Sequence, residues 1–269
     1  MQRPDWAPEG IDIERPSAAR MYDYYLGGSH NFAADRAAAQ AMIAAVPDAP
    51  LMAQANRAFL RRAVQFLVDA GIRQFLDIGS GIPTVGNVHE IAQRAAPESR
   101  VVYVDIDPIA VAHSRAILAG NDRATVVQAD LRTPDRILEA PEVRALLDFT
   151  QPIAVLIVAV LHFIPDSDDP AGILATIRNA LAPGSYLVLS QASYDGRSEE
   201  ERRQAEEVYR RTDSPLYPRS RAELARFFDG FELVEPGLVW VPQWRPDSPD
   251  DAADAERAVF IGGVGRLRD

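Results

Sequence analysis

Neither cysteine nor lysine occurs anywhere in the sequence. Without cysteine, the chain has no disulfide framework, no thiolate metal site and no cysteine nucleophile. Without lysine, it can form no Schiff base, and the Gly-Lys pair of a phosphate-binding P-loop is excluded. The four histidines lie at positions 30, 89, 113 and 162 with no spacing typical of metal ligands, so we expect no bound metal.

Long apolar runs are absent too. The longest, residues 153–161, has nine residues and suits a buried strand, whereas a membrane-spanning helix needs about 20. The first residues show no basic-then-apolar signal pattern, so we expect a cytoplasmic protein without membrane contact. A net charge of −11 disfavours a nucleic-acid partner, because phosphate contacts need a clustered basic face.

The middle of the chain alternates strand-like and helix-like patterns. Apolar runs predict five strands, at residues 75–78, 100–104, 125–128, 153–160 and 186–189. Helical spacing and capping signals predict helices at 88–95, from 108 to about 120, and at 171–181. Strands that alternate with helices indicate an α/β fold with a parallel sheet covered on both faces.

Two flanking regions complete the expected architecture. Residues 17–70 predict an N-terminal helical cap, which includes a helix over 52–70. Residues 191–269 predict C-terminal helices and edge strands, with helices at 197–211 and 220–228, strands near 231–234 and 258–262, and a surface loop at 242–254.

The two late strands would form an antiparallel edge and bring the sheet to seven strands. We see no internal repeat and no linker in the sequence. We therefore expect a single domain over residues 1–269, built around a core at 72–190.

A glycine-rich loop follows the first predicted strand. Gly79 and Gly81 let the backbone turn sharply and approach a ligand closely, and the next helix directs free N–H groups toward it. Such a loop binds many nucleotides, and a purely structural turn is the alternative. A dinucleotide fingerprint would have a third glycine at position 84, where this chain has Thr84. Asp77, at the strand end, would repel a pyrophosphate and suits a cationic amino group.

Acidic residues also follow the next two strands. Asp105 lies 24 residues after Gly81 and can accept hydrogen bonds from both ribose hydroxyls. After the third strand, Asp130 can accept from an adenine amino group while Leu131 packs on the ring. Each aspartate alone is more often a cap or turn residue, but three at successive strand ends narrow the ligand to S-adenosylmethionine.

With these motifs in order, residues 72–190 resemble the class I methyltransferases. The whole chain is similar to an actinobacterial family of S-adenosyl methyltransferases formerly catalogued as a domain of unknown function. The segments that carry this resemblance are SAARMYDYYLGG at 17–28, HNFAADR at 30–36, NRAFLRR at 56–62, QFLDIGSG at 74–81, VVYVD at 101–105, LHF at 161–163 and YPRS at 217–220.

The resemblance implies a Rossmann-like fold, S-adenosylmethionine as cofactor and S-adenosylhomocysteine as product. It implies that the loop at 77–81 holds the methionine end, Asp105 the ribose, and Asp130 with Leu131 the adenine. The full set of positions expected to contact the cofactor is Tyr22, Tyr25, Asn31, Asp77, Gly79, Ser80, Gly81, Thr84, Asp105, Ile106, Asp130, Leu131, Ala159 and Val160.

Catalytic candidates come from the histidines. His162 follows the fourth strand, where sheets of this type hold ligands, although a turn histidine is an equal alternative. His30 is the other candidate base, and it could form a lid over the cofactor with Asn31, Tyr22 and Tyr25. The two tyrosines are three residues apart and share a helix face, so they could stabilise a sulfonium or simply pack in a core.

Three functions stay open at this point. The first is a methyltransferase that acts on a small-molecule acceptor, as a monomer or a homodimer. The second is a regulator or pseudoenzyme that binds S-adenosylmethionine without turnover. The third is an NAD-dependent oxidoreductase, which Thr84 and Asp77 disfavour. The sequence does not indicate the acceptor.

Overall fold

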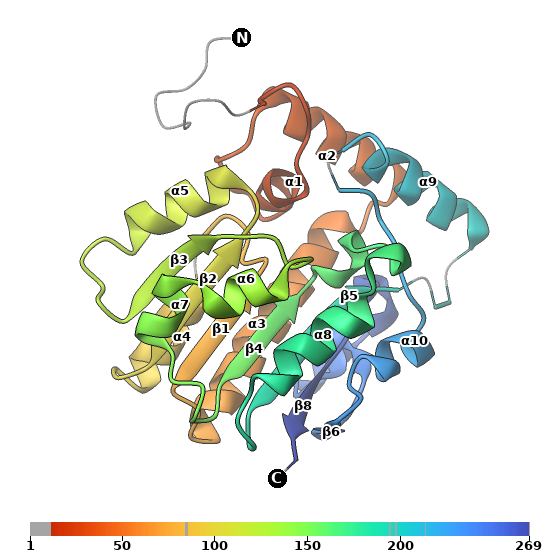
Figure 1. Cartoon of the computed structure of the whole chain (residues 1–269). Helices are drawn as coiled ribbons and strands as arrows, with labels where there is room; N and C mark the ends of the chain where they lie inside the picture. The colour runs from red at the N-terminus through yellow and green to blue at the C-terminus, as the bar shows by residue number, and fades with distance from the viewer. Residues whose placement is uncertain (1–11, 84–85, 194, 197, 213, 269) are drawn as a thin grey trace.

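Runs rich in valine, leucine and isoleucine form the parallel part of a central sheet (Figure 1). The computed structural model describes residues 12–83, 86–193, 195–196, 198–212 and 214–268. The five parallel strands are β1 (Gln74–Ile78), β2 (Arg100–Asp105), β3 (Ala124–Gln128), β4 (Ala154–Val158) and β5 (Tyr186–Ala192). All five predicted strands are therefore confirmed, with ends shifted by a few residues.

The strand order reverses between β1 and β4. The order is β3-β2-β1-β4-β5-β8-β6, so the chain winds outward in one direction from β1 and in the other from β4. In open α/β sheets, ligands bind at such a reversal, beyond the carboxyl ends of the strands. The fold therefore directs attention to the loops that follow β1 and β4.

The antiparallel edge is larger than the sequence indicates. Strand β8 (Phe260–Leu267) pairs with β5, with β6 (Phe231–Leu233) and with β7 (Val239–Trp240). Among the described residues the sheet has eight strands, seven in one continuous order and β7 branching from β8. A strand of two residues has no alternating pattern to read. In β8, glycines replace the expected side chains because neighbours are close: a Cβ on Gly265 would lie 2.7 Å from Phe228.

Helices cover both faces of the sheet. The core helices are α4 (Val88–Ala95), α5 (Pro108–Ile117), α6 (Pro134–Glu139), α7 (Pro141–Leu146) and α8 (Pro170–Asn179). The predicted helices at 88–95, 108–120 and 171–181 are thus confirmed, and α6 and α7 are additional. Asp107 caps α5 by accepting a hydrogen bond of 2.7 Å from the N–H of Ile109, and Pro108 fixes the first helical φ.

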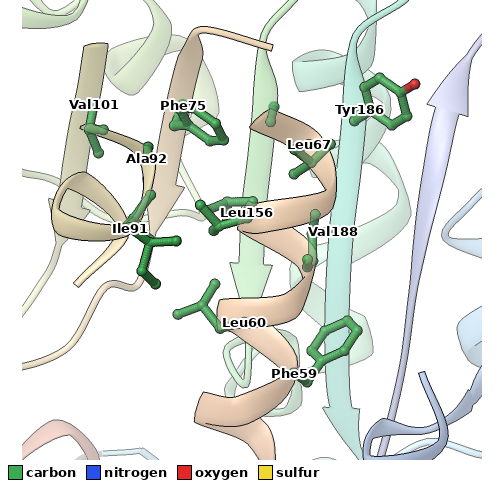
Figure 2. Close-up of a cluster of buried hydrophobic side chains, with 14 of the residues drawn as sticks. Phe59, Leu60, Leu67, Phe75, Ile91, Ala92, Val101, Leu156, Tyr186 and Val188 are labelled. Atoms are coloured by element: carbon green, nitrogen blue, oxygen red, sulfur yellow. The ribbon is translucent and has the colours of Figure 1, made fainter. Parts of the chain in front are cut away.

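The long helix α3 (Ala49–Asp69) lies across one face. Its Phe59 and Leu67 are fully buried against Phe75 of β1 and Leu156 of β4 (Figure 2). Each such side chain contributes about 1.5–3 kcal/mol by leaving water. This packing fixes where the N-terminal turns of α3 meet the strand ends.

Other helices gather at the carboxyl ends of the parallel strands. They are α1 (Ala18–Tyr25), α2 (Ala33–Ala45) and α9 (Glu199–Tyr209), whose apolar residues form one buried cluster with the start of α3 (Figure 1). Helix α10 (Arg221–Arg226) has the predicted Ser220–Glu223 capping box. In the part of the chain that the structure describes, no helix has the length and apolar character needed to cross a bilayer.

The stretch at 242–254 is more than a surface loop. It contains most of one short 3-10 turn, η3 (Val241–Gln243), and all of a second, η4 (Pro249–Ala252), and it ends directly before a third, η5 (Ala255–Ala258). Trp244 is fully buried and meets Phe59 edge-on at 5.5 Å between ring centroids. Arg62 donates to the backbone oxygens of Val241 and Trp244, which satisfies this buried backbone.

Candidate functional site

A cavity of about 680 Å³ opens at the carboxyl ends of β1 to β4, where the strand order reverses. Residues from all four strand ends line it together with α1, α3 and α9. Most of the predicted site residues meet here: Tyr22, Tyr25, Asp77, Gly79, Ser80, Gly81, Asp105, Ile106, Asp130, Leu131, Ala159, Val160 and His162. The predicted position Thr84 lies outside the described residues.

The loop after β1 needs both of its glycines. Gly79 and Gly81 have φ values of +74° and +68°, a region that favours glycine. A Cβ on Gly79 would lie 2.3 Å from Cγ2 of Val160, so no side chain fits there. No described atom lies within 4 Å of a Cβ built on Gly81. The loop therefore packs tightly at Gly79 and leaves space at Gly81.

Asp105 connects the loops after β1 and β2. Its Oδ2 accepts a hydrogen bond of 2.7 Å from the N–H of Gly81, and its Oδ1 accepts one of 2.8 Å from the N–H of Asp107. Burial raises the pKa of the Asp105 carboxyl to about 6, although these backbone hydrogen bonds oppose the rise. Each oxygen keeps a lone pair, so the carboxylate can still accept hydrogen bonds from a ligand.

Asp77 is a buried acid, 5% exposed, whose carboxylate has no hydrogen-bond donor among the described residues. Burial raises its pKa to about 7; the positive charge of Arg57 lowers it and the charge of Asp105 raises it. The neighbouring Ser80 hydroxyl is also buried without a partner among the described residues. Such groups indicate a place for a polar, positively charged ligand group.

Arg57 brings a positive charge to the same end of the cavity. It comes from α3 and lines the cavity beside Asp77, Ser80 and Gly81. Its Nη2 donates a hydrogen bond of 3.1 Å to the backbone oxygen of Gly86. An arginine and an aspartate at one site can hold the carboxylate and the ammonium of an amino acid together.

The ends of β2 and β3 offer a different surface. Ile106 is 56% exposed although it is a large apolar residue, and it lines the cavity together with buried Leu131. Asp130 accepts hydrogen bonds from its neighbour Arg132, at 2.6 Å to Nη2. Burial raises the pKa of Asp130, but the hydrogen bonds from Arg132 outweigh this and lower it. Apolar side chains beside an ionised carboxylate suit a planar ring that carries an amino group.

A chain of hydrogen bonds holds the end of β4. Ala159 has a φ of +60°, which is strained for a residue with a Cβ. Its N–H donates to both the backbone oxygen and the hydroxyl of Ser190, each at 3.0 Å. The Ser190 hydroxyl donates to Oδ1 of Asn56 at 2.6 Å, and Asn56 donates to the Tyr22 hydroxyl at 3.1 Å. Residues from α1, α3 and β5 thus fix the backbone of Ala159 beside the cavity.

The two predicted tyrosines both line the cavity. The Tyr22 hydroxyl donates to the backbone oxygen of Ala53 at 3.0 Å. Tyr25 packs in the same buried cluster as Tyr209 of α9, and the two phenols affect each other's ionisation. Burial raises the pKa of Tyr25 far above its usual value and that of Tyr209 to about 12, so both stay neutral near pH 7.

His162 lies in η1 (Leu161–Phe163), directly after β4. Its Nδ1 accepts a hydrogen bond of 3.3 Å from the N–H of Ala192. Burial, followed by the positive charge of Arg219, lowers its pKa to about 3, so the ring is neutral near pH 7. His162 lines the cavity, but burial and the charge of Arg219 disfavour proton uptake by its ring.

His30 and Asn31 are not among the described residues that line the cavity. Both bond to Asp23, which accepts from the His30 N–H at 2.9 Å and from the Asn31 side chain at 2.8 Å. The His30 ring packs against His113 of α5 at 4.0 Å between centroids. The geometry therefore gives these two residues a part in folding the turn after α1 and does not support the expected lid.

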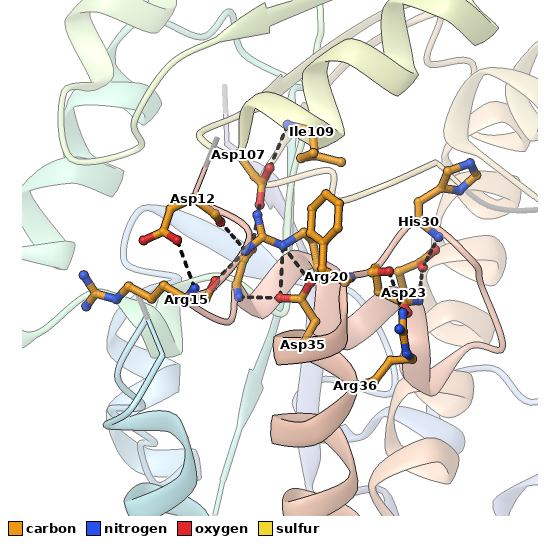
Figure 3. A network of polar contacts seen from close by, with 12 residues as sticks. Asp12, Arg15, Arg20, Asp23, His30, Asp35, Arg36, Asp107 and Ile109 are labelled. Atoms are coloured by element: carbon orange, nitrogen blue, oxygen red, sulfur yellow. Dashed lines mark hydrogen bonds and ion pairs between the residues drawn. The ribbon is translucent and has the colours of Figure 1, made fainter. Parts of the chain in front are cut away.

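A buried polar network ties this N-terminal segment to the loop after β2 (Figure 3). Nε of Arg20 donates to both carboxylate oxygens of Asp35 at 3.0 Å. The Ser17 hydroxyl donates to Oδ2 of Asp107 at 2.6 Å, and Arg20 lies 3.8 Å from the same oxygen. Because removal of one partner would leave a buried charge unpaired, the network firmly attaches α1 and α2 to the end of β2.

Comparison with known proteins identifies the family of this chain. The profile of a family described as S-adenosyl methyltransferase matches residues 4–268. The chain belongs to this S-adenosyl methyltransferase family. Two solved structures agree with it. A DUF574 family protein from Streptomyces avermitilis MA-4680 is 43% identical, with a TM-score of 0.90 over 95% of this chain and 99% of that chain. A candidate methyltransferase from Thermobifida fusca YX is 41% identical, with a TM-score of 0.93 over 99% and 100%.

More distant structures share the fold alone. An O-methyltransferase family protein from Burkholderia thailandensis is 14% identical, with a TM-score of 0.53 over 95% of this chain and 65% of that chain. No curated protein sequence matches the chain. The expected class I methyltransferase fold and family are confirmed, and the protein is an S-adenosylmethionine-dependent methyltransferase.

The residues of this methyltransferase fit its cofactor. Among the described residues, no hydrogen bond reaches the Asp77 carboxylate or the Ser80 hydroxyl, and space is left at Gly81, so an amino-acid group fits there. The sequence reasoning missed Arg57, Asn56 and Ser190. The motif at 56–62 contained the first two, but nothing in the sequence indicated that this part of α3 reaches the strand ends.

Proposed function

We propose that this methyltransferase acts on a small molecule held in the same cavity as the methyl donor, with the whole chain forming one catalytic domain. Bound S-adenosylmethionine supplies a methyl group activated by a sulfonium. The observation that carries the proposal is one cavity lined by Asp77, Asp105 and Asp130 at three successive strand ends.

At the methionine end, Asp77 would accept hydrogen bonds from the ammonium group and Arg57 would bind the carboxylate. The buried carboxylate of Asp77 and the arginine on the same wall support these roles. Ser80 and the backbone at Gly79 and Gly81 would complete this part, since a Cβ at Gly79 would meet Val160 whereas the space at Gly81 is open.

At the nucleoside end, Asp105 would accept from the ribose hydroxyls through its remaining lone pairs. Asp130 would accept from the adenine amino group, and Ile106 and Leu131 would pack on the ring. The exposed apolar side chain of Ile106 at the cavity wall supports this assignment.

The other end of the cavity would hold the acceptor. Six described residues define what we name the acceptor chamber: Tyr25, Met42, Met52, Ala53, Phe163 and Tyr209. Most of them belong to one apolar cluster, so they lie together. The fixed backbone of Ala159 and Val160 would separate this chamber from the glycine loop and align the reacting atoms, which contributes to the rate by orientation.

The test is transfer of a labelled methyl group. The purified protein is incubated with methyl-labelled S-adenosylmethionine and fractions of a cell extract, and labelled products are separated by chromatography. We expect label in at least one small-molecule fraction, and none with Asp77→Asn. A protein that binds S-adenosylhomocysteine but transfers no label in any fraction would be a binding-only regulator, and the proposal would be wrong.

A further inference from the structure

The acceptor chamber differs from the rest of the cavity in its charge. The charged residues that line the cavity come from the N-terminal segment, from α1 and α3, from the carboxyl ends of β1 and β2, from the loops after β2 and β3, and from position 168. The six residues of the chamber carry no formal charge. Its polar groups are the Tyr25 and Tyr209 phenols, which stay neutral near pH 7.

This distribution selects against charged acceptors. A charge moved from water into an apolar space without a partner costs several kcal/mol or more. Among the described residues of the chamber, an anion would find no arginine and a cation would find no carboxylate. An uncharged molecule avoids both costs.

His162 provides a polar group beside this chamber. It lines the cavity, and its ring packs against Phe163 at 4.3 Å and Phe260 at 5.7 Å between centroids. Because its Nδ1 accepts from the N–H of Ala192, the neutral ring carries its proton on Nε2. No described residue accepts a hydrogen bond from Nε2, so this N–H is left for a ligand in the cavity that His162 lines.

We propose that the methyl acceptor is an uncharged, largely apolar small molecule that fills the acceptor chamber and accepts a hydrogen bond from Nε2 of His162. This inference rests on the proposed function, since it assigns the acceptor of the same cavity. It replaces the expected role of His162 as a general base with that of a hydrogen-bond donor that orients the acceptor.

The experiment uses four probes that share one ring: naphthylmethanol, naphthylacetate, naphthylmethylammonium and naphthalene. Each is titrated by calorimetry or ligand-observed NMR into the protein saturated with S-adenosylhomocysteine. We expect naphthylmethanol to bind at least about tenfold more tightly than either charged probe, which corresponds to about 1.4 kcal/mol. Equal or tighter binding of a charged probe, or no binding of naphthylmethanol, would overturn the proposal.

Two variants test whether the probes bind in the acceptor chamber. Met52→Arg adds a positive charge to the chamber wall and should weaken naphthylmethanol and strengthen naphthylacetate. Gln54→Arg, two residues away on the exposed side of α3, is the matched control and should change neither affinity. If Met52→Arg has no more effect than Gln54→Arg, the probes bind elsewhere and the chamber is not the acceptor site.

His162→Phe separates donation from packing. Loss of the Nε2–H should weaken naphthylmethanol several-fold and leave naphthalene, which cannot accept a strong hydrogen bond, unchanged. An equal loss for both probes would mean that His162 only packs, and would overturn its assigned role. Binding of S-adenosylhomocysteine is measured first in every variant. Loss of cofactor binding would contradict the proposed function, whereas unexpected probe affinities with cofactor binding intact would contradict only the acceptor inference.

Discussion

Oδ2 of Asp105 accepts a hydrogen bond of 2.7 Å from the backbone N–H of Gly81. The end of β2 thereby holds the glycine loop that follows β1, across the edge of the sheet where ligands bind. The same carboxylate also accepts from the N–H of Asp107, the residue that caps α5. One side chain thus organises the two loops that our proposal gives to the methionine and ribose ends of the cofactor.

Replacement of Asp105 by asparagine should weaken cofactor binding at least about tenfold. The amide presents an NH₂ group to one of the two backbone N–H groups, so that a hydrogen bond to the loop is lost and an acceptor for the ribose is removed. Calorimetric titration with S-adenosylhomocysteine at pH 8 measures the change. The exposed Asp122→Asn is the control and should bind like the wild type. A folded Asp105→Asn variant with unchanged affinity would rule out the ribose assignment.

Gly79→Ala should destabilise the protein more than a second glycine substitution at positive φ. Its new Cβ meets Val160 at 2.3 Å, whereas a Cβ on Gly120, which has a φ of +86°, meets no described atom within 4 Å. Both variants lose about 1–2 kcal/mol to backbone strain, and Gly79→Ala should lose about 1–3 kcal/mol more to the clash.

Urea denaturation at equilibrium compares these two variants. Adding Val160→Ala to Gly79→Ala removes the methyl groups nearest to the new Cβ and should recover part of the stability. If Gly79→Ala and Gly120→Ala lower the free energy of unfolding by the same amount, the close packing of Gly79 on Val160 does not affect stability.

Cofactor affinity should fall as the pH drops below about 7. Burial raises the pKa of Asp77 to about 7 in the free protein, while a bound ammonium group favours the ionised form. Below this pH, binding must first release a proton, so the Kd of S-adenosylhomocysteine rises by up to about tenfold per pH unit. Asp105, with a pKa of about 6, adds to the slope at lower pH. Titrations with S-adenosylhomocysteine from pH 6 to 8 measure how its Kd depends on pH. A Kd that stays constant over this range would contradict the role of Asp77.

Asp77→Asn should stabilise the ligand-free protein above pH 7 while it weakens cofactor binding. The folded-state pKa of Asp77 lies above its unfolded value, so its contribution to stability is full below about pH 4 and is lost as the pH rises through 7. The amide removes this cost, and Tm at pH 8 should rise by a few degrees. Thermal unfolding at pH 8 and pH 5 checks the sign of the change in Tm. A lower Tm for Asp77→Asn than for the wild type at pH 8 would show that the buried carboxylate does not destabilise the folded protein.

The strand-end wall of the cavity could be predicted from the sequence because its residues lie at the carboxyl ends of strands. A buried strand is readable as an apolar run, and the residue after it must lie at the sheet edge. Asp77, Asp105 and Asp130 lie in or just beyond the last residues of β1, β2 and β3, so the strand pattern places all three at the carboxyl end of the sheet. Ile106 and Leu131 follow because they are adjacent in the chain.

The helical side could not be predicted in the same way. Arg57 and Asn56 reach the strand ends because Phe59 and Leu67 set how α3 lies on the sheet, and this packing depends on residues far apart in the sequence. His30 and Asn31 share a motif-rich segment with Tyr22, yet the turn at Gly27 and Gly28 directs them to Asp23 and α5. Gly28 lies so close to Asp23 that a Cβ there would be 2.0 Å from its carboxylate.

The central claim is that the strand ends of β1 to β3 bind the methyl donor through three carboxylates. Calorimetric titration of the wild-type protein with S-adenosylhomocysteine and, separately, with NAD tests it most directly. We predict one binding site per chain for S-adenosylhomocysteine, binding weakened in Asp77→Asn, Asp105→Asn and Asp130→Asn but not in Asp122→Asn, and no binding of NAD. Binding of NAD, or affinity for S-adenosylhomocysteine that none of the three substitutions changes, would contradict the account.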